Sequence, residues 1–195
     1  TDLTYLDGTR LPDVRDARTR LVFPLIQTGG ARTTTLLLVN PNKSQAQVVL
    51  RLYGADGAPR GGEVHRTLPG RGRSVLDAAT SFPGLLETDS IQLTADRALL
   101  GVALCGDSQA LACLEALPAG IDQNVLYSHH VASGNFGVEY DSYLSLVNTG
   151  DTDATLAVTL ANDAGTSIAT VNLAVPAHGK QLVNVVAPLT DWSAI

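Results

Sequence analysis

Two adjacent histidines, His129 and His130, are the first side chains in this sequence to consider for chemistry, because imidazoles serve as bases and metal ligands. Neighbouring residues on a strand face opposite sides of a sheet, so both rings cannot point at one site without a bulge. The sequence also has no Gly-x-Ser-x-Gly elbow, no phosphate-binding loop and no His-Glu-x-x-His helix. We therefore predict no catalytic residue and a protein that is not an enzyme. A Ser-His-Asp triad built from distant strands stays open, since triads are defined by geometry.

The two cysteines, Cys105 and Cys113, have seven residues between them. That spacing can close a short surface loop in an oxidising compartment. The alternatives are free thiols and a two-cysteine metal site, but a structural zinc needs four ligands and no nearby histidine or third cysteine supplies them. We predict a disulfide, which would contribute roughly 2.5 kcal/mol on the chain-entropy model.

Two further groups of side chains could bind ligands. Asn148, Asp151 and Asp153 gather oxygen atoms in one turn that could hold calcium, although the twelve-residue loop with a terminal glutamate is missing. The same residue types are ordinary in β-turns, so we expect no metal and no cofactor. Tyr140 and Tyr143 stand beside acidic residues and could line a glycan site, or they could simply cover a sheet edge.

An internal repeat sets the organisation of the chain. Residues 36–40 recur as 144–148, an offset of 108, and Pro69 and Gly72 recur as Pro176 and Gly179, an offset of 107. A period of this length suits a whole domain and is too long for a solenoid unit. We predict residues 1–18 as an N-terminal extension, 19–119 as the first copy of a domain and 120–195 as the second.

Each copy has the pattern of β-strands. Val48, Leu50 and Leu52 alternate with polar residues, and 156–160 and 171–175 alternate in the same way. Turn residues separate these segments every eight to twelve positions, which is typical of an antiparallel β-sandwich. We expect residues 89–105 to form two further strands that close the first copy, and residues 108–117 to be the one helical candidate.

These segments carry a resemblance. A Leu-Val-Asn strand, an alternating strand that ends in an Asp-Gly type of turn, and a Leu-Pro-Gly-x-Gly segment resemble tandem Ig-like β-sandwich repeats of secreted bacterial surface proteins. The resemblance implies an all-β fold of two tandem antiparallel Ig-like domains, a secreted or cell-surface location, and a role in display or adhesion. An accessory domain beside an enzyme is also implied, and no catalytic residue is carried over.

We predict that the second copy lacks its closing strands, because the sequence given stops just short of the counterpart of Ser90. An open sheet invites an added strand. Leu3, Tyr5 and Leu6 could supply that strand from another copy, and Trp192 and Ile195 stand near the open end. A fragment of a longer protein and a solution within one chain are the alternatives.

Composition and charge narrow the partners. The net charge of −6 and an aromatic content of 5% argue against nucleic acid. Residues 1–97 carry a balance of +2 and residues 98–195 a balance of −8, a difference that favours head-to-tail contact between copies. The sequence holds no apolar run of membrane-spanning length, so we expect no membrane insertion. It begins at Thr1 without a leader, which we interpret as a processed product.

Together these features predict a non-enzymatic extracellular structural or adhesive protein, with self-association or binding to another cell-surface protein. A filament subunit that assembles head to tail by strand complementation is the specific form of this prediction. A glycan- or protein-binding accessory module of a larger secreted protein is the alternative.

Overall fold

The computed structural model describes residues 5–8, 13–120, 134–135, 139–140, 142–162 and 164–184. Its fold is all-β and mostly antiparallel, as the alternation predicted. Among the described residues, no helix is long and apolar enough to cross a membrane. In chain order the elements are β1 (Tyr5–Gly8), a 3-10 turn (Val14–Asp16), β2 (Arg18–Phe23), β3 (Thr33–Val39), β4 (Ala46–Tyr53), β5 (Pro59–Leu68), β6 (Arg73–Asp77), α1 (Ala78–Ser81), β7 (Ser90–Gly106), β8 (Ala110–Glu115), β9 (Leu117–Pro118), β10 (Gly134–Asn135), β11 (Glu139–Tyr140), β12 (Tyr143–Val147), β13 (Ala154–Ala161), β14 (Ser167–Val175) and β15 (Lys180–Asn184).

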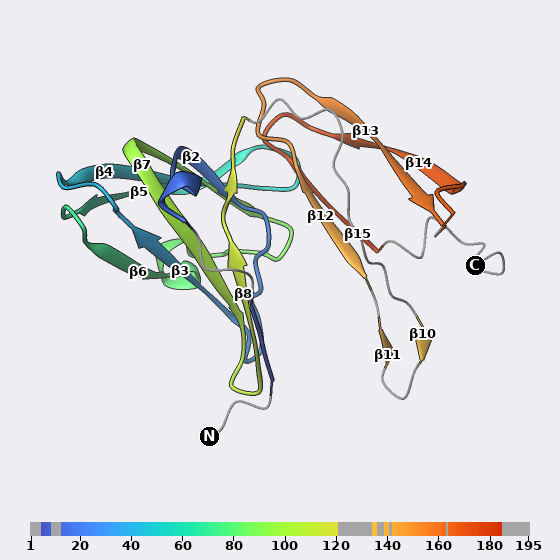
Figure 1. Cartoon of the computed structure of the whole chain (residues 1–195), viewed down its shortest axis with the longest axis horizontal. Coiled ribbons are helices and arrows are strands. Elements are labelled where there is room, and N and C mark those ends of the chain that lie inside the picture. The colour runs from blue at the N-terminus through green and yellow to red at the C-terminus, as the bar shows by residue number, and fades with distance from the viewer. Residues whose placement is uncertain are drawn as a thin grey trace.

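A single strand of 17 residues, β7, connects the two layers of the first unit, which we define as β2–β9, residues 18–118 (Figure 1). Its first half pairs with β2 and β4, and its second half pairs with β3 and β8. The pairing order is β9-β2-β7-β4-β5 in one layer and β1-β8-β7-β3-β6 in the other. Both layers therefore depend on the same strand.

The hairpin predicted within residues 89–105 is wrong, because this segment continues as one strand. The pairing with β2 is irregular between Thr94 and Leu99, but residues 95–98 include no glycine, proline or asparagine that would reverse the chain. The reversal comes later, where Asp107 Oδ1 accepts hydrogen bonds from the backbone N–H groups of Gln109 and Ala110, each within 3.0 Å.

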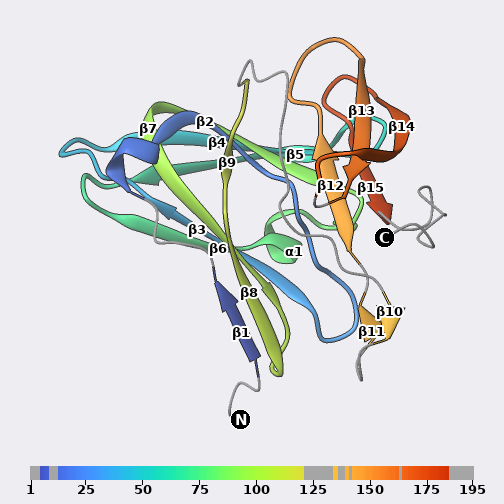
Figure 2. The ribbon, with the colours of Figure 1, turned by 45° about the vertical axis from the view of Figure 1, so that its right-hand side comes forward.

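The helix considered for residues 108–117 is also wrong. Residues 110–115 form β8, which pairs antiparallel with the second half of β7. β1 adds to the outer edge of β8 in the parallel direction, with Tyr5 opposite Ala110 and Gly8 opposite Cys113 (Figure 2). Long-range pairing on both sides of β8 outweighs any local helical preference of this short segment.

The core of the first unit lies between its two layers. Alternate residues of β3 and β4 point inward and are at most 3% exposed. Burial of each leucine or valine among them stabilises the fold by roughly 1.5–3 kcal/mol. The cluster consists of Leu21, Phe23, Ile26, Leu36, Leu38, Ala46, Val48, Leu50, Leu52, Leu68, Leu76, Ala78, Phe82, Leu85, Ile91, Leu93, Leu99, Ala103, Cys105 and Ala116.

The internal repeat is reproduced strand for strand. The first repeat, β3–β6 (residues 33–77), corresponds to the second repeat, β12–β15 (residues 143–184). β4 and β13 begin and end 108 residues apart, and β6 and β15 begin and end 107 residues apart. The pairing registers correspond as well, since Val39 lies opposite Arg73 and Val147 lies opposite Lys180.

The turns of the two repeats are also built alike. Asn40 Nδ2 donates to the Ser44 carbonyl at 2.9 Å, and Asn148 Nδ2 donates to the Thr152 carbonyl at 2.8 Å. The same left-handed φ of 57° occurs at Arg71 and at its counterpart His178. Side-chain capping and backbone conformation therefore follow the sequence repeat.

Candidate functional site

The candidate site is the pair of open strands in the second repeat. β12 pairs with β15 and β13 pairs with β14, as two separate two-stranded sheets (Figure 1). No strand within the described part of the chain takes the place that β7 has beside β3 and β4. An edge strand presents a row of backbone N–H and C=O groups to which another strand can pair.

The inner face beside these edges is apolar and exposed. Val48 of β4 is 1% exposed, whereas its counterpart Leu156 of β13 is 38% exposed. Leu50 and Leu52 are fully buried, but their counterparts Val158 and Leu160 are only partly buried. The same sequence pattern that fills a core in the first unit is thus left half covered in the second repeat.

One turn of the second repeat docks on the first unit and fixes where these edges point. The backbone N–H of Lys180 donates to the Ala55 carbonyl at 3.1 Å. The His178 ring stacks on Tyr53 with a centroid separation of 4.9 Å and an interplanar angle of 23°. Glycine is required at position 57 here, because a Cβ would collide with the carbonyl of Ala177.

Lys180 is the buried centre of this junction. Its side chain is 1% exposed, and its Nζ donates to the carbonyl oxygens of Glu87 at 2.7 Å and Asp89 at 2.9 Å. Burial lowers the pKa of Lys180 to about 8, and the nearby Asp89 and Glu87 carboxylates act in the opposite direction. The buried Asp89 carboxylate in turn accepts from Arg60 Nη1 at 2.8 Å. This network ties the second repeat to the loop before β7.

Sequence reasoning missed the role of Lys180, although a signal was available. Lys180 is the one lysine or arginine after residue 97, and it aligns with Arg73 in the repeat. Arg73 is exposed in the first repeat, so the repeat alone predicts a surface position. The burial arises from the contact between the two parts of the chain, which the local sequence pattern does not encode.

In the turn predicted to hold calcium, the side-chain oxygens of Asn148, Asp151 and Asp153 contact other groups of the protein. Asn148 Oδ1 accepts from the backbone N–H two residues further on at 2.9 Å. Asp151 Oδ1 pairs with His178 Nε2 at 3.0 Å, and Asp153 Oδ1 accepts from the Ala177 N–H at 2.9 Å. Throughout the described ranges, no group of three His, Cys, Asp or Glu side chains could hold a metal ion. The contacts are those of a turn that is capped and held against the junction.

The predicted disulfide is absent, and both Cys105 and Cys113 are free thiols. Cys105 lies opposite Ala112 and Cys113 lies opposite Leu104 in the β7–β8 pair. Directly opposed residues share a face, so the two sulfurs lie on opposite faces of the sheet. Cys105 is buried at 3.6 Å from Thr34 Oγ1, and this burial raises the pKa of its thiol. The cysteines therefore give no support to an oxidising compartment.

Of the two tyrosines predicted to line a glycan site, the structure describes the side chain of Tyr143 alone. Tyr143 begins β12 and is 57% exposed. Tyr140 pairs with Gly134 in the β10–β11 hairpin, and its side chain lies outside the described residues. A shared sugar-binding face stays a prediction.

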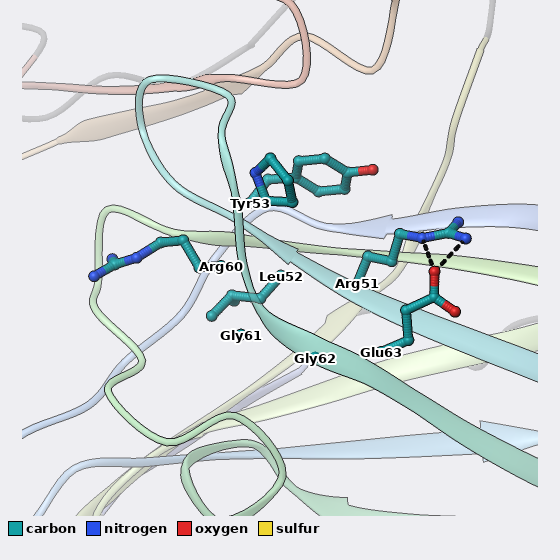
Figure 3. A pocket seen from close by; sticks show the side chains of 8 residues that line it. Arg51, Leu52, Tyr53, Arg60, Gly61, Gly62 and Glu63 are labelled. Atoms are coloured by element: carbon teal, nitrogen blue, oxygen red, sulfur yellow. Dashed lines mark hydrogen bonds and ion pairs between the residues drawn. The ribbon is translucent and has the colours of Figure 1, made fainter.

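A shallow pocket of about 320 Å³ lies on the outer side of β4 and β5 (Figure 3). Figure 3 shows the Arg51 guanidinium directed at the Glu63 carboxylate, and their closest atoms are 2.6 Å apart. The Arg60 guanidinium pairs with Asp89. Both arginines of the pocket are therefore held by carboxylates, and the open strands remain the better candidate site. The pocket is lined by Arg51, Leu52, Tyr53, Pro59, Arg60, Gly61, Gly62 and Glu63.

The N-terminal strand predicted as a donor does form, but it pairs within its own chain. β1 contains Tyr5 and Leu6 and lies on β8 of the first unit. Addition to another copy would require that β1 leave β8. The remaining predicted positions, Leu3, Trp192 and Ile195, lie outside the described residues, as do His129 and His130.

The fold and its open edges define an all-β protein built on a repeated four-strand motif. Residues 15–123, more than half of the chain, match the family described as "Family of unknown function (DUF5719)", and the chain belongs to this family. No curated protein matches the chain at a significant level.

Two solved structures are similar to parts of this chain. The crystal structure of Thermotoga maritima 1070 is 11% identical with a TM-score of 0.44, over 52% of this chain and 94% of that chain. The Anabaena sensory rhodopsin transducer is 18% identical with a TM-score of 0.37, over 45% of this chain and 95% of that chain. Similarity at this level carries no argument about function.

Proposed function

We propose that this protein is a non-enzymatic extracellular structural or adhesive protein whose copies assemble head to tail by strand addition to the second repeat. One observation carries the proposal. Among the described residues β13 pairs with β14 alone, whereas β4 pairs with β7 as well, and Leu156 of β13 is 38% exposed against 1% for its counterpart Val48.

Two further features support assembly between copies. The balance of +2 in residues 1–97 and −8 in residues 98–195 favours contact of one copy's first part with another copy's second part. A contact between unlike surfaces does not close on itself, so it propagates into a filament. The extracellular location and the adhesive role rest on the resemblance to tandem Ig-like repeats of secreted bacterial surface proteins.

Particle size of the full chain tests this proposal. Light scattering and negative-stain imaging of the purified protein should find oligomers or filaments that grow with concentration. Raising the salt concentration should slow their growth, because the two halves attract each other through charge.

A matched pair of variants assigns the assembly to the open face. Leu156→Lys places a charge on the inner face of β13 and should abolish the large species. Thr155→Lys places the same charge on the exposed outer face and should leave them intact. Circular dichroism would show that both variants keep their strands. A wild-type chain that stays monomeric near 20.4 kDa at every concentration would overturn the proposal.

A further inference from the structure

The junction between the first unit and the second repeat is held by separate contacts and not by a shared sheet. Among the described strands, none of β12–β15 pairs with a strand of the first unit. We call residues 176–180 the tip, and we call the surface that receives it, residues 53–57 and 87–89, the acceptor surface. Apart from the tip, Ser145 Oγ donates to the Pro24 carbonyl at 2.6 Å. The second repeat can therefore leave the first unit without the loss of any strand pairing that the structure describes.

The closed junction leaves polar atoms without partners. Within the described ranges, the buried side-chain atoms that lack a hydrogen-bond partner are Ser90 Oγ, Gln92 Nε2 and His178 Nδ1. Ser90 lies opposite Tyr53, on which the His178 ring stacks, and Gln92 follows two residues later on the same face of β7. Water satisfies such atoms in an open chain, so a contact that leaves them unpaired is weakened. The junction therefore opens more readily than a fully paired one.

Exchange of the tip between copies costs no contact. When the tip of one copy docks on another copy, it forms the same hydrogen bonds from Lys180 and the same stack of His178 on Tyr53 as within its own chain. The connection from Pro118 to Tyr143 contains 24 residues, a length that reaches up to about 80 Å when extended. Exchange of an identical element is for this reason a low-cost route to association.

We propose that the tip of one copy docks on the acceptor surface of the next copy, so that the junction within the chain also joins copies head to tail. The partner is a second copy of this chain, recognised by an ammonium that two backbone carbonyls hold beside an aromatic stack. The contact joins unlike surfaces, so an assembly extends from both of its ends. The inference goes beyond strand addition at β13 and does not rest on it, because the two contacts use different residues.

Two glycines provide a variant that blocks the acceptor surface and a matched control. Gly57 and Gly165 lie at equivalent positions of the β4–β5 and β13–β14 turns, with φ of 79° and 78°. A Cβ at Gly57 would collide with the Ala177 carbonyl of the docked tip, whereas nothing lies within 4 Å of a Cβ at Gly165. Gly57→Ala should therefore release the tip, and Gly165→Ala imposes the same backbone strain without that collision.

A substitution in the tip gives the complementary variant. Lys180→Glu leaves the acceptor surface intact, but its carboxylate would face the two carbonyl oxygens that hold the ammonium. Arg73→Glu, at the exposed equivalent position of the first repeat, is its control. The amide of residue 180 donates to the Ala55 carbonyl in the closed junction. In Gly57→Ala and in Lys180→Glu this amide should exchange its hydrogen at least about tenfold faster. Circular dichroism would show that both variants keep their strands.

Mixing the two variants tests the exchange. Both chains carry Leu156→Lys, which should block strand addition at β13. The Gly57→Ala chain has an intact tip and the Lys180→Glu chain an intact acceptor surface. Light scattering should therefore find a dimer of about twice 20.4 kDa in the mixture and in neither chain alone. The Lys180 amide of the Gly57→Ala chain should regain its protection in this dimer. Gly165→Ala in place of Gly57→Ala, or Arg73→Glu in place of Lys180→Glu, should lower the yield at least about tenfold, because the control chain keeps its own junction closed.

Three results would overturn the inference. These are no dimer in the mixture, equal yields with Gly57→Ala and Gly165→Ala, and an amide of residue 180 that stays protected in both single variants. None of them bears on strand addition, which Leu156→Lys removes from the experiment. A wild-type chain that stays monomeric would instead overturn the proposed strand addition, and the mixture would still give the dimer, because no intact tip competes there for the acceptor surface of its own chain.

Discussion

The first and second repeats have corresponding strands, similar registers and similar turn contacts, yet they differ in burial. Leu36 and Leu38 of β3 are 0% exposed, while their counterparts in β12, Leu144 and Leu146, are only partly buried. The difference is the presence of β7 beside β3 and β4. Hairpin geometry is therefore encoded locally in each repeat, whereas a closed core requires a strand from far along the chain.

The largest effect should come from shortening the same leucine in both repeats. Leu38→Ala removes a fully buried side chain and should lower the free energy of unfolding by about 3 kcal/mol. Leu146→Ala, at the equivalent position of β12, should cost about 1 kcal/mol, because that side chain is only partly buried. Urea denaturation followed by hydrogen exchange of β3 and β12 would measure both. Equal losses would contradict the difference in burial.

The junction gives the next largest effect, through its dependence on pH. Burial lowers the pKa of Lys180 to about 8 from 10.5, so between these values the unfolded chain binds the proton more tightly than the folded chain. The free energy of unfolding should therefore rise with pH across this window, by about 2–3 kcal/mol.

Lys180→Met should remove this rise, and Arg73→Met, at the exposed equivalent position of the first repeat, should leave it unchanged. Cys105 acts in the opposite direction, since burial raises the pKa of its thiol, but it is present in all three proteins. The charged groups that face the ammonium or its partners, Glu87, Asp89 and Arg60, are likewise present in all three proteins. Denaturation at pH 7.5 and pH 10 measures the change in the free energy of unfolding between these pH values. If the ammonium were solvated, this change would be the same for the wild type and for Lys180→Met.

The turn asparagines should give an intermediate effect. Asn40 is 0% exposed, and its Nδ2 donates to the carbonyls of Ser44, Leu68 and Pro69. Asn40→Ala leaves these buried acceptors without that donor and should cost about 2 kcal/mol. Asn148→Ala should cost about half as much, because its turn is in contact with solvent. Thermal unfolding of both variants would rank them, and a larger loss for Asn148→Ala would contradict the comparison.

A cross-strand pair should give the smallest effect. The Arg51–Glu63 ion pair between β4 and β5 is replaced in the second repeat by Thr159 and Thr170, whose hydroxyl oxygens are 3.0 Å apart. The double variant Arg51→Thr with Glu63→Thr should change the free energy of unfolding by less than about 1 kcal/mol, since both charged groups are about 40% exposed. A melting temperature lowered by more than 8 °C would show that this pair matters more than its exposure implies.

Much of the fold could be predicted from the sequence, because the residue patterns that produce the strands and turns lie within short segments. The alternation of Val48, Leu50 and Leu52 and the turn at Asn40 determine strands and reversals within a few residues. The continuous course of β7 and the strand at 110–115 could not be predicted, because both depend on pairing with distant strands. The disulfide was predicted from spacing alone, and the register of β8 on β7 places Cys105 and Cys113 on opposite faces.

The place of β7 in both layers also determines the order in which the chain can fold as it is synthesised. β2, at residues 18–23, finds its partners only at residues 91–99 and 117–118. The first unit therefore cannot close until residue 118 has left the ribosome, and its leucine-rich strands stay without their β7 partner until then. The hairpins of the second repeat close over far shorter separations. A nascent chain would thus complete its first core late and then gain its second repeat almost at once.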